Sequence, residues 1–233
     1  MIKIEHTDVY GWEAAIRGMR NPMNSWDKSD SFVCKEKAMS WEEIEDTCGK
    51  CPRGIDSCDI YDDKDYYIIG ENDLDLMRRL SKAGADHAKF LRYINVTFDL
   101  AAPLYFFKEW STYKVGTVAN STSTMHKIHA KPFTLEDFSH EHLNTTSLRT
   151  LEMLIVHLNN ARYVYNRDKD KADWWQMIQL LPSSYNQKRT VQVNYQVLKA
   201  MYHARKSHKL DEWREFCKWC ETLPYFKEIC VEV

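Results

Sequence analysis

Four cysteines between residues 34 and 58 have types and spacing that could bind a metal ion. Cys48 and Cys51 form a C-x-x-C pair, with Cys34 before it and Cys58 after it. Four thiolates can hold zinc in a tetrahedral site, and the same ligands suit an iron–sulfur cluster. Gly49 would allow a tight turn between the paired ligands. The alternative is a set of ordinary thiols on a surface segment, because a second tight pair is missing.

A later polar stretch has the chemistry to surround a phosphate. Residues 117–124 are rich in Ser and Thr, and we expect them to form a loop. Hydroxyls and backbone N–H groups of such a loop can bind an anion, and Lys114 supplies a positive charge just before it. A plain solvated loop with a surface lysine is the alternative.

Other reactive side chains are expected to be structural. Cys217 and Cys220 also form a C-x-x-C pair, but they share a helical stripe with Trp213 and Phe216, so both thiols should fill the core. We expect four histidines to be solvated or hydrogen-bonded, and two adjacent tryptophans to lie in the core or an oligomer interface: His126, His129, His140, His142, Trp174 and Trp175.

The bulk composition excludes several classes of function. The chain has 233 residues, 44% of them hydrophobic, and a formal net charge of −2, so no global basic field attracts nucleic acid or an anionic membrane. No apolar run approaches the roughly 20 residues of a membrane span. The N-terminal residues do not resemble a signal peptide. We therefore expect a cytoplasmic protein with reduced thiols.

The elements around the polar stretch have clear patterns. Residues 94–100 alternate between apolar and polar side chains, which predicts a half-buried strand. Pro103 suits the first turn of a helix, and we expect that helix to reach Trp110.

The rest of the chain mixes helices with isolated strands. Asn72 or Asp73 is expected to cap a helix, and residues 21–70 are expected to be a Cys-containing insertion. Since the elements do not alternate regularly as βαβ units, the pattern indicates an α+β fold in a single domain. Strands are predicted at 2–4 and 189–193, and helices at 11–20, 72–82, 147–166, 170–180, 195–206 and 211–222.

Three stretches of the sequence follow one another in a familiar order and spacing. The strand Tyr93–Pro103 leads into a helix that ends in Lys-Glu-Trp110, and a polar loop follows. Further on, Leu181-Pro182 precedes a strand that ends in Val193-Asn194 and a helix that ends near Arg205. Together they resemble the flavin-dependent thymidylate synthases, the ThyX family, over roughly residues 72–125 and 176–216.

The resemblance implies a ThyX-like α+β fold over residues 1–233, with a small, mostly antiparallel sheet packed with long helices. Members of the family use reduced FAD to transfer a one-carbon unit from methylenetetrahydrofolate to dUMP, giving dTMP, and NADPH supplies the electrons. It therefore implies a cytoplasmic homotetramer that binds a pyrimidine deoxynucleotide, with an enzymatic methyltransferase activity.

The resemblance also places binding residues, although it places no catalytic one. The nucleotide contacts fall on Arg205, Lys188, Arg189, Ser121, Thr122, Ser123, Thr124 and Glu109. The cofactor contacts fall on Tyr93, Thr112, Tyr113, Lys114 and Asn194. A metal site in the insertion would use Cys34, Cys48, Cys51 and Cys58.

The motif loop departs from the family's pattern. The family's Arg-His-Arg falls on Thr112, Tyr113 and Lys114, and only Lys114 keeps a positive charge, without the planar fork of Arg. The family's Asn-Glu falls on Ala119 and Asn120, so a carboxylate is lost. The nucleotide half of the site thus survives better than the flavin half.

Two other functions therefore stay open. One is a non-catalytic nucleotide-binding protein of this fold that has lost flavin binding. The other is an interaction protein whose Cys-containing insertion is a metal-stabilised docking module.

Overall fold

The computed structural model describes residues 2–34 and 66–233 of the chain. It divides into two compact units. The first, called the sheet unit here, consists of Met1–Asp8, Thr97–Val193 and Ala204–Lys218. The second, called the helical unit, consists of Val9–Val96, Asn194–His203 and Trp219–Val233. The prediction of a single domain over residues 1–233 stays a prediction.

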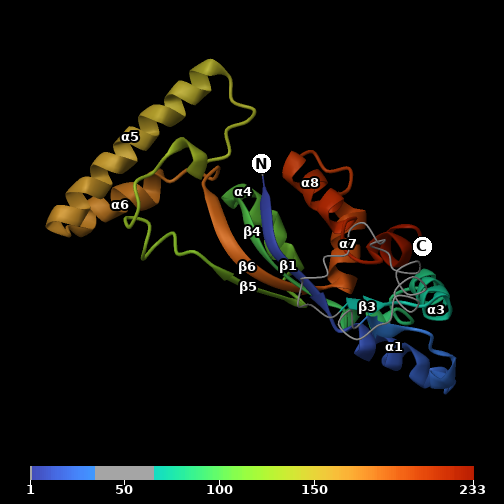
Figure 1. Cartoon of the computed structure of the whole chain (residues 1–233). Coiled ribbons are helices and arrows are strands. Elements are labelled where there is room, and N and C mark those ends of the chain that lie inside the picture. The colour runs from blue at the N-terminus through green and yellow to red at the C-terminus, as the bar shows by residue number, and fades with distance from the viewer. Residues whose placement is uncertain (1, 35–65) are drawn as a thin grey trace, which may run out of the picture. The chain divides into compact units, whose positions relative to one another are not determined.

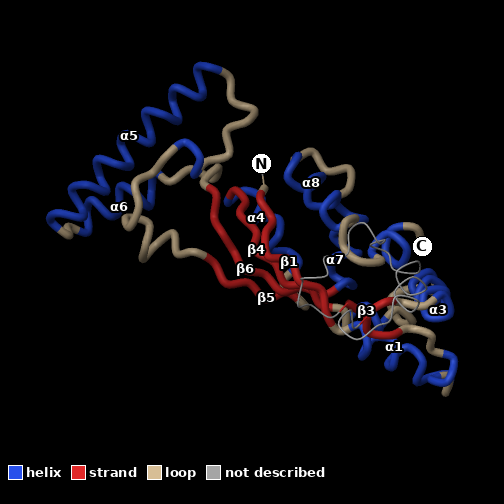
Figure 2. Tube along the Cα trace, viewed as in Figure 1, coloured by secondary structure: helices blue, strands red, loops and turns tan. Residues whose placement is uncertain are grey.

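A four-stranded sheet organises the sheet unit (Figures 1 and 2). Its strand order is β1 (Lys3–Tyr10), β4 (Asn95–Pro103), β6 (Asn186–Asn194) and β5 (Thr117–Ser121). Buried and half-exposed residues alternate along most of β4, as the period of two predicts. The fold is α+β with an antiparallel sheet, which confirms the predicted class.

Two helices pack their aromatic side chains against the sheet. The short helix α4 (Leu104–Trp110) follows β4 directly, with Pro103 at its N-cap, and α8 is Asp211–Cys220. The rings of Trp110 and Trp213 stack with centroids 5.9 Å apart. Burial of aromatic surface on this scale fixes how α4 lies on the sheet. Trp213, Phe216, Cys217 and Cys220 are all buried, which confirms the predicted core stripe.

A pair of helices forms a second core in the sheet unit. The helices α5 (Thr145–Asp168) and α6 (Lys171–Leu180) lie side by side (Figure 1). Leu151 and Leu158 of α5 meet Met177 of α6 in a buried cluster. The helix predicted at 147–166 is therefore confirmed, and α5 is two residues longer at each end.

The helical unit packs three helices around aromatic side chains. These helices are α1 (Trp12–Arg20), α3 (Glu71–Lys82) and most of α7 (Tyr195–Arg205). The Trp12 ring meets Tyr195 edge-on at 5.5 Å. Gly11 enters α1 with φ 96°, and a Cβ there would lie 2.0 Å from the Tyr93 carbonyl oxygen, so no other residue fits without a shift.

The helix α3 begins at a cap that lies far away in the sequence. The Asp30 carboxylate accepts hydrogen bonds from the backbone N–H groups of Asn72 and Asp73, at 2.9 and 3.1 Å. The predicted caps, Asn72 and Asp73, are wrong, since Gly70 is the N-cap residue. A Cβ on Gly70 would lie 2.2 Å from Asp30, so the close approach of this carboxylate needs glycine.

Asp73 instead forms the centre of a buried polar network. Its side chain is fully buried, and Arg20 Nε donates to it at 2.6 Å. Ser29 and Ser31 donate hydroxyl hydrogen bonds to its other oxygen, at 2.7 and 2.6 Å. The network ties residues 29–31 to the start of α3, and both oxygens of the carboxylate accept hydrogen bonds.

The predicted loop 117–124 is a strand over Thr117–Ser121, and only residues 122–124 lie outside it. Strand β5 pairs antiparallel with β6, with Thr117 opposite Val193 and Ser121 opposite Arg189. Without β5, the backbone N–H and C=O groups along one edge of β6 would have no partners. Backbone pairing thus overrides the weak strand propensity of these residues. The small strand β2 (Phe32–Cys34) pairs antiparallel with β3 (Tyr66–Ile68) in the helical unit.

Candidate functional site

Three segments of the sheet unit meet at the guanidinium of Arg205. Its Nη1 lies 2.5 Å from Oε2 of Glu109, on the last turn of α4. Its Nε donates to the phenol oxygen of Tyr113 at 3.0 Å, just past the end of the same helix. Arg205 therefore contacts two residues to which the resemblance assigns ligand contacts, Glu109 and Tyr113.

Aromatic and imidazole side chains complete this group. The guanidinium carbon of Arg205 lies 5.0 Å from the centre of the Trp213 ring and 5.6 Å from that of Tyr113. Nε2 of His208 lies 3.2 Å from the Glu109 oxygen that Arg205 also contacts. We call Glu109, Tyr113, Arg205, His208 and Trp213 the Arg205 cluster.

The Arg205 cluster has the chemistry of an anion site. The Arg205 side chain is only 19% exposed, and rings on two sides restrict where its planar fork can point. Such a fork recognises carboxylate and phosphate oxygens with good geometry. The Glu109 carboxylate, itself 35% exposed, holds the position that a ligand anion would take.

The predicted ligand Lys188 faces a different partner. Its ammonium lies 2.9 Å from Oδ2 of Asp99, and the Thr190 hydroxyl donates to the same carboxylate at 2.6 Å. The hydrogen bond with Asp99 raises the pKa of Lys188 above its ordinary value. Asp99 of the same protomer thus largely balances the charge of Lys188, although the Lys188 side chain is exposed.

The neighbouring Arg189 lies against α4. Its guanidinium carbon is 3.7 Å from the centre of the Phe107 ring, and Nε donates to Gln187 at 3.0 Å. Burial lowers the pKa of Arg189. Successive residues of a strand point to opposite faces, so Lys188 and Arg189 cannot hold one phosphate together.

The predicted hydroxyl ligands lie at the far end of β5 from Tyr113. The Thr117 hydroxyl donates to the Tyr113 carbonyl oxygen at 2.8 Å, whereas Ser121 is four residues later, about 13 Å along the strand. The Thr122 amide donates to the Lys188 carbonyl at 2.9 Å, and the Ser123 hydroxyl accepts from the His126 amide. Thr124 follows directly. The predicted nucleotide residues therefore form two groups within one protomer.

The polar groups of most predicted cofactor residues form hydrogen bonds within the protein itself. Thr112 donates to the Glu109 carbonyl at 2.8 Å, and Tyr113 accepts from Arg205. In the helical unit, the Asn194 side chain accepts from the Val197 amide at the start of α7, and Tyr93 is 51% exposed.

These residues do not fit a flavin diphosphate within one protomer. A diphosphate needs several cations or oriented donors. Of the five predicted positions, Lys114 alone carries a positive charge, and no ion pair of Lys114 occurs among the described residues.

The predicted metal site falls mostly outside the described residues. Cys48, Cys51 and Cys58 lie in that part of the chain, so the site stays a prediction. Cys34 is described and is buried at the end of β2. Across residues 2–34 and 66–233, no group of three or more His, Cys, Asp or Glu side chains is arranged to hold a metal ion.

Sequence reasoning missed His208 and the ion pair of Glu109. His208 lies three residues past the end of α7, so no helical spacing links it to Arg205. None of the helices in the described ranges is long and apolar enough to cross a bilayer.

The comparisons with known proteins support the fold. No protein-family model and no curated protein matches the sequence. Two crystal structures of thymidylate synthase X (ThyX) from Helicobacter pylori with FAD and dUMP match, each with a TM-score of 0.64 and 16% identity. The alignments cover 100% and 99% of this chain and 98% of each ThyX chain. The chain is therefore structurally similar to ThyX over its full length.

Proposed function

We propose that this protein binds a pyrimidine deoxynucleotide monophosphate and that Arg205 holds the phosphate. The observation that supports it is the half-buried guanidinium, which lies beside two aromatic rings and is already bound to a carboxylate. The similar ThyX structures contain dUMP, which makes dUMP the first ligand to test.

Each residue of the Arg205 cluster has a part in this proposal. Arg205 offers its fork to two phosphate oxygens. Tyr113 and Trp213 limit the rotamers of the guanidinium, so less side-chain entropy is lost on binding. Glu109 must turn away to admit the phosphate, and its partly exposed side chain can reach solvent. Lys114 adds an exposed cation nearby in sequence.

A second candidate function is flavin-dependent methylation of dUMP to dTMP. The full-length match to ThyX structures that contain both FAD and dUMP favours it. FAD would supply the redox chemistry, with NADPH and methylenetetrahydrofolate as co-substrates. Because the five predicted cofactor residues do not fit the diphosphate within one protomer, this candidate requires donors from other subunits, as in a homotetramer. No catalytic step is assigned to residues of this chain.

The nucleotide proposal predicts that dUMP stabilises the folded protein through Arg205. At a hundredfold excess over its Kd, a ligand adds about 2.7 kcal/mol, which corresponds to a rise of several degrees in Tm for a chain of this size. Arg205→Ala should abolish this rise. The matched control is Arg149→Ala, an exposed arginine of α5, which should keep it. A full dUMP-dependent rise in the Arg205→Ala protein would remove Arg205 from the site.

A visible spectrum separates the two candidate functions. We expect the purified protein to be colourless and added FAD to leave its Tm unchanged, because the predicted cofactor positions provide one cation. Flavin absorbance at about one FAD per chain, released on denaturation, would instead establish the methylation candidate as the better one.

A further inference from the structure

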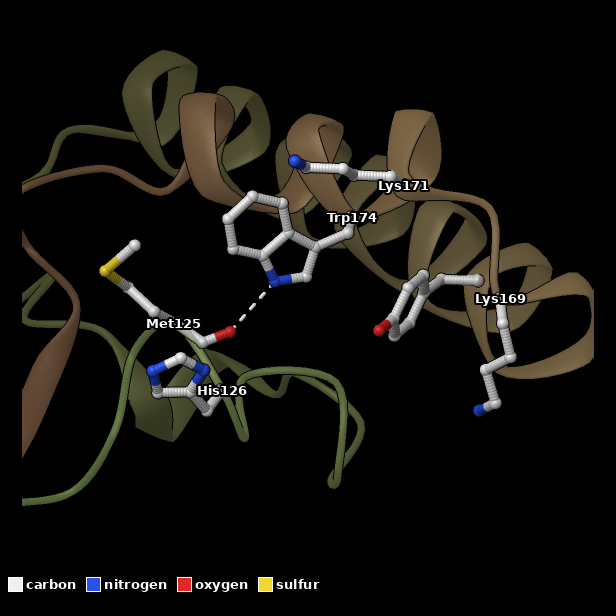
Figure 3. A pocket seen from close by; sticks show the side chains of 6 residues that line it. Met125, His126, Lys169, Lys171 and Trp174 are labelled. Carbon is white, nitrogen blue, oxygen red and sulfur yellow. Dashed lines mark hydrogen bonds between the residues drawn. The ribbon is translucent and has the colours of Figure 1, made fainter.

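A pocket of about 250 Å³ lies between the α5–α6 turn and the segment that follows β5 (Figure 3). It is within the sheet unit and shares no residue with the Arg205 cluster. Its walls combine aromatic and basic side chains with one methionine. The lining residues are Met125, His126, Tyr165, Lys169, Lys171 and Trp174.

A fixed indole ring forms one wall of the pocket. Nε1 of Trp174 donates to the Met125 carbonyl at 2.8 Å, and the ring packs in part against the α5–α6 core (Figure 3). An indole held in this way presents a preorganised flat surface, which costs little side-chain entropy when a ring stacks on it. Trp174 thus has a use besides the core packing expected from the sequence.

Two lysines give the pocket a positive charge. Lys169 places its ammonium 5.3 Å from the centre of the Tyr165 ring, and Lys171 extends beside Trp174 (Figure 3). Among the described residues, neither ammonium has a carboxylate within ion-pair distance. The carboxylate of Asp170, which lies between the two lysines in sequence, accepts a hydrogen bond from the Ala172 amide at 2.9 Å and thereby caps α6.

The surroundings of the pocket contain charges of both signs. His129 packs edge-on against Tyr165, with ring centroids 4.9 Å apart. Burial lowers the pKa of His129, and the charges of Lys169, Lys127 and Arg162 lower it further. Asp168 pairs with Arg167 and Asp170 caps α6, so Lys169 and Lys171 are the lysines of the pocket that can attract a bound anion.

We propose that this pocket binds an aromatic phosphate of mononucleotide size. The ring of the ligand stacks on Trp174, and the charges of Lys169 and Lys171 attract its phosphate. Aromatic side chains accept any nucleobase through its flat face, and lysines bind phosphate as point charges. At about 250 Å³ the pocket is smaller than sites for drug-sized ligands, which begin at about 300 Å³, so it has room for one nucleotide at most. The site is independent of the one proposed at Arg205.

The test follows the indole N–H resonance of Trp174 by NMR in the Arg205→Ala protein, so that the other proposed site is silent. Trp174→Phe assigns the resonance and keeps a ring in the core. Uridine monophosphate should shift it saturably. Uridine and inorganic phosphate should each bind at least about tenfold more weakly, because each lacks one half of the recognition. No shift at millimolar uridine monophosphate, or equal affinity for inorganic phosphate, would overturn the proposal.

Charge variants separate the pocket from general attraction. Lys169→Asn combined with Lys171→Gln should weaken binding at least about tenfold; Asn suits position 169, where φ is 58°. The pair Lys82→Gln and Lys209→Gln removes the same charge from exposed lysines elsewhere and should leave the affinity unchanged. Equal affinities in the two double variants would contradict the site, provided that the other indole resonances show an intact fold.

Discussion

Glu109→Gln is expected to tighten the binding of dUMP by about tenfold, measured as a Kd by isothermal titration calorimetry. In the wild-type protein Glu109 lies 2.5 Å from Arg205 and must be displaced by the ligand. A hydrogen bond to a charged group contributes about 1.5–3 kcal/mol, and partial exposure of both side chains reduces this toward the lower value. Gln removes the competing charge and leaves Tyr113 to orient the guanidinium.

A matched substitution controls for net charge. Glu152→Gln removes one exposed carboxylate from α5, within the same unit, and should leave the Kd unchanged. The Glu109→Gln gain should also vanish when Arg205 is replaced by Ala in the same chain, since the two residues act through one contact. Unchanged or weaker dUMP binding in Glu109→Gln would show that the carboxylate does not block the site.

Asp73→Asn is expected to lower the free energy of unfolding by about 3–5 kcal/mol. The Asp73 carboxylate is fully buried and pairs with an Arg20 side chain that is 4% exposed. Asn leaves that guanidinium buried without a counter-charge, and it cannot accept all the hydrogen bonds that Ser29 and Ser31 now donate. Urea denaturation at neutral pH measures the loss, and a value below about 1 kcal/mol would contradict the role of this network.

The same network predicts part of the acid sensitivity. Burial raises the pKa of Asp73, but the hydroxyls of Ser31 and Ser29 and the charge of Arg20 more than offset it, and the net pKa lies below 3.8. A carboxyl group whose pKa is lower in the folded than in the unfolded state stabilises the folded protein at pH values above its unfolded pKa. That stability is lost as the pH falls below about 4. Asp73→Asn should remove this component. Asp75→Asn, an exposed pair with Arg79, should preserve it.

The fold was predictable where the signal was local. Alternation along β4 and the buried stripe of α8 each depend on residues within one element, and both are present. Such a pattern is the same in every fold that buries one face of that helix or strand, so it can be predicted from the sequence.

Long-range contacts account for the errors. Strand β5 has few apolar residues and exists because β6 offers an edge. The cap of α3 comes from Asp30, more than forty residues earlier than Asn72. No window of local sequence contains either partner.

In the candidate site, too, features set by local sequence were predictable, and contacts set by tertiary packing were not. The resemblance assigned ligand contacts to Arg205, Glu109 and Tyr113, and Arg205 contacts both other side chains. The pairing of Glu109 with Arg205 depends on which charged side chains tertiary packing brings together, so the sequence could not give it. The separation of Lys188 from Arg189 depends on the true extent of β6, which begins at Asn186, whereas the predicted strand began only at residue 189.

A crystal structure of the protein with dUMP tests the nucleotide site most directly. We predict phosphate oxygens at about 2.7–2.9 Å from the guanidinium nitrogens of Arg205, with the Glu109 carboxylate turned away. A nucleotide bound elsewhere on the chain, with the Arg205–Glu109 contact still closed, would contradict the proposal.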